Sequence, residues 1–361
     1  MAAVSHNSVL ISPAGLGDGS VRAGHAVAAW LFICCALVFA MVVVGGVTRL
    51  THSGLSITEW QPIVGTLPPM SAADWDSAFS KYQLTPEYQQ VNRGMQLAEF
   101  QRIFWWEYFH RLLGRLIGVA FLVPFLWFLA RRRIPPGYGM RFAGIFALGA
   151  AQGALGWYMV RSGLVDDPRV SQFRLTAHLG LAFLIFAAML WCALSLISRS
   201  SGSHAAAKSD FSGTGRLATA VACLVFVQVL AGGMVAGIHA GYAYNTFPLM
   251  NGAIVPAEIM MLDPWWKNFS YNMATVQFDH RLLAWILAAA VPVLWWKVVR
   301  NADVSTAARV GAHLLLAMLA VQLALGVLTL IHVVPVPLAA LHQAGAVLLF
   351  ALAVNLAHAL R

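Results

Sequence analysis

The sequence has few cysteines and few charged residues. Only four of its 361 residues are cysteine, and all four lie inside long apolar stretches: Cys34, Cys35, Cys192 and Cys223. No polar loop therefore offers a cysteine pair for a disulfide bond or a thiolate metal site. Charged residues make up 10% of the chain, and only 14 residues are acidic. A chain this poor in charge is too apolar for a soluble fold of its size.

Long apolar runs dominate what is present. Hydrophobic residues make up 60% of the sequence, and the mean hydropathy is +0.71. Several runs reach the roughly 20 residues that a helix needs to cross the hydrocarbon core of a bilayer. The sequence predicts an all-α polytopic membrane protein with eight transmembrane helices, at residues 26–48, 103–130, 139–160, 174–197, 216–238, 274–299, 306–331 and 338–360.

The positive charges predict the orientation. They gather in the loops between the second and third, fourth and fifth, and sixth and seventh predicted helices. Such loops face the cytoplasm, so both termini should be cytoplasmic, residues 1–25 should form a tail and residues 199–215 a cytoplasmic linker. The segment 49–102 should lie outside. The net charge of +9 thus reflects the topology. Membrane lipid is the expected surrounding partner, and no basic stripe with interleaved aromatics indicates a nucleic acid.

An internal repeat divides the chain. His110-Arg111-Leu112-Leu113 recurs as His280-Arg281-Leu282-Leu283, and Gly45-Gly46 aligns with Gly232-Gly233 so that His52 matches His239. The stretch from Gln152 to Gly156 likewise matches that from Gln322 to Gly326. We therefore predict two pseudo-symmetric four-helix bundles of parallel topology, residues 26–198 and 216–361.

Each half carries two histidines at similar depth in its helices: His110, His178, His280 and His342. A single histidine at such a place is usually satisfied by a neighbouring carbonyl, but four in a symmetric pattern favour ligands. Copper or zinc would call for cysteine, methionine or carboxylate in a tight cluster, whereas one imidazole from each of two facing helices suits the axial positions of a haem.

Two further matched pairs have open roles. Arg111 and Arg281 each follow a predicted ligand and could pair with haem propionates or reach lipid phosphate. For His52 and His239, at matched helix ends, gating, propionate contact and interfacial solvation stay equally open.

The halves differ chemically at one point. Glu107, three residues before His110, aligns with Gln277, and Arg115 aligns with Trp285. An i,i+3 spacing places Glu107 and His110 on one helix face. A carboxylate at membrane depth beside a haem favours proton chemistry in the first half, with a structural salt bridge to an arginine as the alternative.

Four stretches together resemble one family. They are the run from Gly45 to Ser56 (GGVTRLTHSGLS), Glu107-Tyr108-Phe109-His110-Arg111, Asn245-Thr246-Phe247-Pro248-Leu249-Met250, and Phe278-Asp279-His280-Arg281. The chain is similar to the haem A synthase family (Cox15/CtaA), in the type without a cysteine pair in an outer loop.

The resemblance implies an enzyme of the bacterial inner membrane that oxidises the C8 methyl group of haem O to a formyl group by successive hydroxylations. It implies that Glu107, His110 and His178 form the substrate-haem site and that His280 and His342 bind a haem b cofactor. Haem O synthase, cytochrome oxidase assembly factors and an unidentified electron donor are the implied partners, and a homo-oligomer is left open.

Two other classes are compatible with parts of the pattern. A cytochrome b-type electron-transfer protein would stack two haems across the membrane, with ligands near both faces, whereas the four histidines share one level. A membrane haem carrier or oxidase assembly factor would bind haem but would not need the Glu107 asymmetry.

Overall fold

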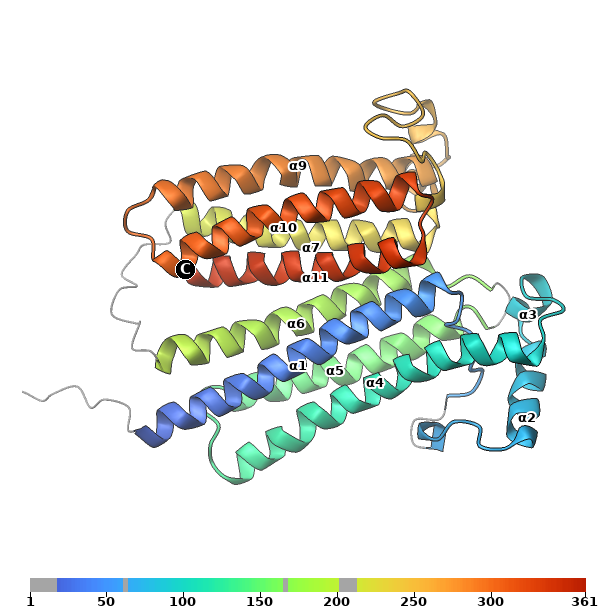
Figure 1. Cartoon of the computed structure of the whole chain (residues 1–361), viewed down its shortest axis with the longest axis horizontal. Helices are drawn as coiled ribbons and strands as arrows, with labels where there is room; N and C mark the ends of the chain where they lie inside the picture. Colours follow the sequence, from blue (N-terminus) through green and yellow to red (C-terminus); the bar gives the residue numbers. More distant parts are fainter. Residues whose placement is uncertain (1–17, 61–63, 165–167, 201–212) are drawn as a thin grey trace, which may run out of the picture.

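The computed structural model describes residues 18–60, 64–164, 168–200 and 213–361 (Figure 1). Within these residues the chain is helical and contains no β-strand. Eight helices are long and apolar enough to cross a membrane: α1 (Asp18–Leu50), α4 (Leu97–Ala130), α5 (Gly139–Arg161), α6 (Gln172–Ser200), α7 (Gly213–Gly237), α9 (Met273–Arg300), α10 (Thr306–Ile331) and α11 (Val336–Ala359). The predicted all-α polytopic class is confirmed.

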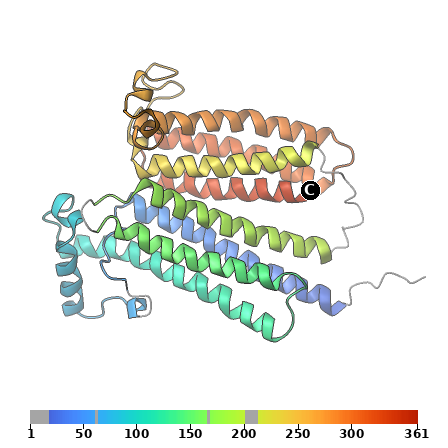
Figure 2. The same cartoon turned by 180° about the vertical axis from the view of Figure 1, so that it is seen from behind.

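The eight helices form two groups of four. Helices α7, α9, α10 and α11 lie together on one side, and α1, α4, α5 and α6 on the other (Figures 1 and 2). The groups meet where α6 packs on α7 and α11 and where α1 packs on α11. This arrangement fits the predicted repeat, and the domain limits 26–198 and 216–361 stay a prediction.

Equivalent glycines bring the two groups close together. A Cβ atom on Gly46 of α1 would overlap the side chain of Gln343 on α11, and one on Gly233 of α7 would lie 3.0 Å from Thr176 Oγ1 and 3.4 Å from Leu179 on α6. Gly46 and Gly233 are matched in the repeat, and Gln343 and Leu179 each follow a predicted haem ligand. The contact between the halves is therefore built twice from corresponding positions.

A small cap of short helices covers one end of the first half. It consists of α2 (Ala72–Gln83) and α3 (Pro86–Gln90), whose aromatic side chains pack against Phe100 and Phe104 at the start of α4. In the second half, the loop before α9 contains the short α8 (Asn268–Tyr271) and three single-turn 3₁₀ helices: Ala240–Tyr242, Ala257–Met260 and Trp265–Lys267.

Three predicted boundaries need correction. Helix α4 begins six residues before the predicted residue 103, because Glu99 accepts a hydrogen bond from the Gln96 N–H (2.9 Å) and Phe100 continues the helix into the cap. Apolar length marks only the membrane-embedded part of such a helix. Residues 18–25 of the predicted tail belong to α1, and residues 199–200 and 213–215 of the predicted linker belong to α6 and α7. The rest of that tail and linker lies outside the described residues.

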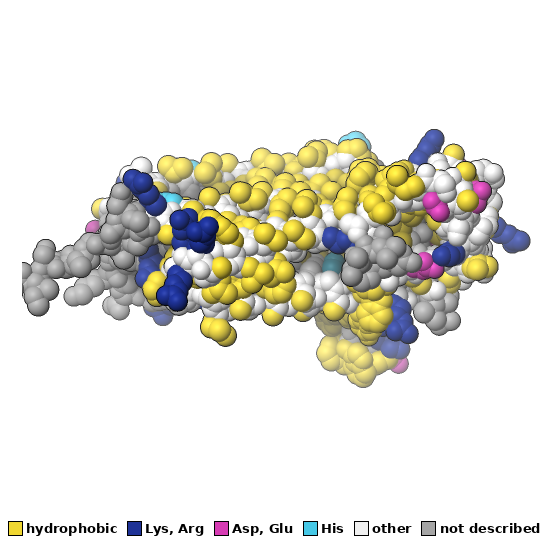
Figure 3. All heavy atoms as spheres, turned by 90° about the horizontal axis from the view of Figure 1, so that it is seen from below, with side chains coloured by type: hydrophobic (Ala, Val, Ile, Leu, Met, Phe, Trp, Pro, Cys, Tyr) yellow, Lys and Arg dark blue, Asp and Glu magenta, His cyan; other side chains and the backbone are white. Residues whose placement is uncertain are grey.

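The long segments of the described chain lie at one end of the bundle. Residues 131–138 and 301–305 share the end at which α1 begins and the chain finishes, while the cap and the loop before α9 share the opposite end (Figures 1 and 2). Lys and Arg side chains appear at both ends of the bundle, and most of the visible acidic side chains lie at the end with the cap (Figure 3). The predicted orientation stays a prediction.

Candidate active site

The four predicted ligands lie toward the end of the bundle that carries the cap and the loop before α9. His178, His280 and His342 sit two turns or so into α6, α9 and α11, whereas His110 lies deeper in sequence along the extended α4. All four side chains are half-buried. His110 lies within electrostatic range of His178, and His280 within range of His342. Each half therefore contributes one pair of imidazoles from two helices.

Each histidine packs against a glycine on a neighbouring helix. A Cβ atom at Gly156 or Gly326 would lie 2.9 Å from the Cε1 atom of His178 or His342. At Gly45 it would lie 3.0 Å from His110 Nε2, and at Gly232 3.3 Å from His280 Cε1. Such distances are below ordinary carbon contacts. The four glycines are needed to leave room for the four rings.

Three of the histidines also meet a glutamine one turn before that glycine. Gln152 Nε2 lies 3.4 Å from His178 Nε2, Gln322 Nε2 lies 3.2 Å from His342 Nδ1, and Gln228 Nε2 lies 3.2 Å from His280 Nε2. Each amide also donates to the backbone carbonyl of its histidine, at 2.9–3.1 Å. Sequence reasoning used Gln152 and Gln322 only to align the repeat and missed this contact. The signal that reveals it is the recurrence of Gln-x-x-x-Gly in α5, α7 and α10.

The residues present fit a haem in each half. The buried Nδ1 of His178 and the side-chain oxygens of Gln152, Gln228 and Gln322 have no hydrogen-bond partner among the described residues. In the described chain, no group of three or more His, Cys, Asp or Glu side chains could hold a metal ion. Paired imidazoles beside glycines, without thiolate or carboxylate neighbours at the ring, form a donor set suited to the two axial positions of a flat macrocycle.

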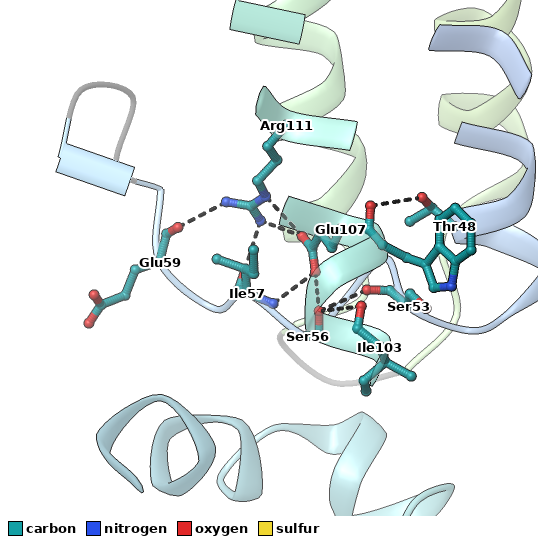
Figure 4. Close-up of polar contacts among 9 residues, drawn as sticks. Thr48, Ser53, Ser56, Ile57, Glu59, Ile103, Glu107 and Arg111 are labelled. Atoms are coloured by element: carbon teal, nitrogen blue, oxygen red, sulfur yellow. Dashed lines mark hydrogen bonds and ion pairs between the residues drawn. The ribbon is translucent and has the colours of Figure 1, made fainter. Parts of the chain in front are cut away.

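Glu107 lies buried one turn from His110 and ties the outer loop to α4 (Figure 4). Its Oε2 atom accepts hydrogen bonds from Ser56 Oγ and from the Ile57 N–H, both at 2.8 Å. Its Oε1 atom forms a salt bridge with Arg111, at 2.6 Å to Nη2 and 2.9 Å to Nε. Arg111 also donates to the carbonyls of Ile57 and Glu59. The salt bridge considered as the alternative role of Glu107 is therefore present.

The second half repeats this arrangement, except that the residue aligned with Glu107 donates hydrogen bonds to its loop where Glu107 accepts them. Arg281 donates to the carbonyls of Tyr244 and Thr246 and to Gln277 Oε1, which matches the contacts of Arg111. Gln277 Nε2, however, donates to the carbonyls of Ala240 and Ala243, where Glu107 accepts. The loop conformation thus accommodates an anion in the first half and an amide donor in the second.

The predicted role of the two arginines in binding propionate stays a prediction, since each guanidinium is engaged by its own loop. Arg111 also lines a cavity of about 200 Å³ with Arg161, Glu59, Trp60 and Trp157. Because the Glu59 carboxylate is paired with Lys81 at 2.7 Å, the two guanidinium groups favour an anionic group there. Arg115 is half-buried on α4, while Trp285, its counterpart, stacks on Phe247 at 5.9 Å between ring centroids.

His52 and His239 face each other where the two halves meet. Their rings are nearly parallel, with centroids 6.2 Å apart and an interplanar angle of 9°, and both backbones adopt a positive φ. Arg49 Nη2 lies 2.9 Å from His239 Nε2. Burial and the nearby Arg49 lower the pKa of His239 to about 4, and the same causes lower the pKa of His52. The pair is therefore neutral at physiological pH.

Comparison with known proteins identifies the family of the chain. The Cox15/CtaA family, described as cytochrome oxidase assembly protein, matches residues 28–354. The chain belongs to this family. It is 61% identical over 335 residues to the protein named Heme A synthase from Nitrosospira multiformis, with 93% of each chain covered. It is also 55% identical over 346 residues to the Heme A synthase of Nitrosomonas eutropha, with 96% of each covered, and 48% identical to that of Parvibaculum lavamentivorans.

Proposed function

We propose that this protein is a haem A synthase, an oxidoreductase that converts the C8 methyl group of haem O into the formyl group of haem A. The observation that carries the proposal is the chemical difference between two otherwise matched sites. Both halves hold a pair of imidazoles beside glycines, but only the first places a carboxylate one turn from a ligand. The site in the second half is therefore suited to holding a haem, and the site in the first half is suited to modifying one.

The second half is proposed to bind the cofactor. His280 and His342 would hold a haem b, and when bound this group supplies an iron that exchanges single electrons. Gly232 and Gly326 leave room for the two rings, and Gln228 and Gln322 fix them. With Gln277 bonded to two carbonyls, this half has no acid at the position of Glu107.

The first half is proposed to bind haem O as substrate through His110 and His178. Conversion of a methyl to a formyl group by two successive hydroxylations moves protons through the site. With O2 as the oxygen source, each hydroxylation takes up two electrons from the donor and two protons and releases one water, and the second product, a gem-diol, loses water to give the formyl group. Glu107 is the group placed to hold such a proton, at Oε2, from which Ser56 Oγ leads to the outer loop. Arg111 fixes the direction of the carboxylate through the salt bridge.

The setting of the reaction is also part of the proposal. The chain would lie in the bacterial inner membrane with both termini in the cytoplasm, receive its substrate from haem O synthase and pass haem A to oxidase assembly factors. An electron donor or acceptor of the membrane would complete the cycle. The cavity beside Arg111 and Arg161 is a candidate site for the haem carboxylates.

The function is tested by production of haem A. The chain is expressed in a bacterium that makes haem O and lacks its own haem A synthase, and the extracted haems are separated by chromatography. The proposal expects haem A to appear with the chain and to be absent without it. Bound haem without conversion would instead identify a haem carrier.

A further inference from the structure

Three of the four helices whose glycines face the ligand histidines share a short sequence pattern, and the fourth lacks it. In α5, α7 and α10 a glutamine stands four residues before the glycine that packs on the imidazole. In α1 the residue four before Gly45 is Met41. The repeat aligns Met41 with Gln228, so the exception falls on His110 of the proposed substrate site.

Met41 occupies the place that the glutamine takes elsewhere. A Cβ atom at Gly114, one turn after His110 on α4, would lie 3.2 Å from Met41 Cε. The thioether is thus packed against α4 beside the histidine, yet it offers no donor and only a weak acceptor. The His110 ring makes no hydrogen bond within the described part of the chain, whereas each of the other three rings lies 3.2–3.4 Å from an amide.

A ligand imidazole binds iron best when neighbouring groups hold its ring in one orientation. The Nε2 atoms of Gln152, Gln228 and Gln322 each face the ring of one histidine and donate to the backbone carbonyl of the same histidine. Each glutamine therefore ties the ring to its own helix turn. At His110 no such group is available.

We propose that the three glutamines are positioning residues that strengthen His178, His280 and His342 as haem ligands, and that Met41 leaves His110 as the weak and exchangeable ligand. This inference rests on the proposed function, because it assigns the weak ligand to the substrate haem. A substrate must enter and a product must leave, so one of its two ligands has to release readily. The cofactor haem, held between two glutamine-supported rings, has no such requirement.

Reciprocal exchange of the two residues tests the inference on the purified, haem-loaded protein. Met41→Gln gives the first half the side chain of the second, and Gln228→Met does the converse. Each variant uses a residue that the matched position already accommodates, and Met41→Leu controls for loss of the thioether alone. Carbon monoxide is the probe, because it binds ferrous haem only where an axial ligand gives way.

In the unaltered protein, carbon monoxide should bind the haem of the first half and leave that of the second half in its low-spin state. Met41→Gln should reduce this binding, and Gln228→Met should create it in the second half together with a loss of haem affinity of about 10–100-fold, the usual effect of removing such a partner. Met41→Leu should behave like the unaltered protein.

Unchanged carbon monoxide binding and haem retention in both reciprocal variants would overturn the inference. The same spectra are informative if no haem A is formed, since they report ligand strength and not conversion. If no haem A is formed but the variants exchange their carbon monoxide spectra as expected, the difference in ligand strength is supported and only the proposed function is wrong. If haem A is formed but the reciprocal variants do not exchange their carbon monoxide spectra, the inference about the glutamines is wrong and the proposed function still stands.

Discussion

At the scale of single residues, the two halves differ most at Glu107 and Gln277. Both side chains have the same length and both engage the arginine four residues on. Glu107 accepts from a hydroxyl and a backbone N–H, whereas Gln277 donates to two carbonyls. Each loop is therefore built around the hydrogen-bonding capacity of its own residue. Exchanging the two residues would lower the stability of the fold as well as alter the chemistry of the site, because a buried polar group without a hydrogen-bond partner is destabilising.

The histidines of the second half give a prediction at this scale. His280→Ala removes one proposed axial ligand of haem b, so the low-spin spectrum of that haem should be lost from the purified protein. His313→Ala is the matched control, since His313 accepts a hydrogen bond from Trp295 at the opposite end of the bundle. Retention of the full low-spin signal by His280→Ala would show that the ligands are other residues.

At the scale of helices, the glycines that face the histidines should tolerate no side chain. Gly326→Ala would place a methyl group 2.9 Å from His342 Cε1. The ring must shift, so we expect a changed haem b spectrum and haem loss during purification. Gly311→Ala in the same helix meets only ordinary contacts at 3.8 Å and should leave the spectrum unaltered. Equal effects of both substitutions would point to helix propensity and not to the ligand.

The cap should weaken as the pH rises. Burial raises the pKa of Glu87 on α3 to about 8 from an ordinary value of 4.5, with a further contribution from Glu107. Between these values the folded cap keeps a proton that the unfolded segment releases, so cap stability is greatest at low pH and falls as the pH rises through about 8. Hydrogen exchange in α2 and α3, corrected for the intrinsic rate, should show less protection at pH 9 than at pH 6. Glu87→Gln should remove this difference, and a pH dependence that survives the substitution would assign it to another group.

The sequence predicted the helices well and their surroundings poorly. Eight spans, the matched histidines and the Glu107–Gln277 difference follow from apolar length and the repeat, because both are visible in the letters alone. The cap around Phe100 and Phe104 was missed since a helix that leaves the bilayer loses its apolar signature. The glutamine contacts were missed since they join neighbouring helices, and only the structure shows that Gln228 meets His280 and that Met41 packs against α4.

At the scale of the whole molecule, the loops predict one orientation. The loops around residues 131–141 and 297–309 are rich in Lys and Arg and lie at the end where the described chain begins and finishes (Figure 1), so this end should be cytoplasmic. A reporter active only outside the cytoplasm should work when fused after Ser80 in the cap and fail after Asp303. Activity at Asp303 and not at Ser80 would invert the molecule and place all four histidines near the cytoplasmic face.

The division of labour between the halves is the central claim, and Glu107→Gln tests it most directly. The variant gives the first half the side chain that the second half carries, and it removes a group whose positioned proton transfer is typically worth about 10²–10⁴-fold in rate. In the haem O-producing strain we expect the protein to retain its haem b spectrum while haem O or a partly oxidised haem accumulates in place of haem A. Gln277→Glu should not create a second active site, so haem A should still be formed only in the first half. Haem A at the unaltered level in the Glu107→Gln membranes would contradict the account and would make the salt bridge with Arg111 a purely structural one.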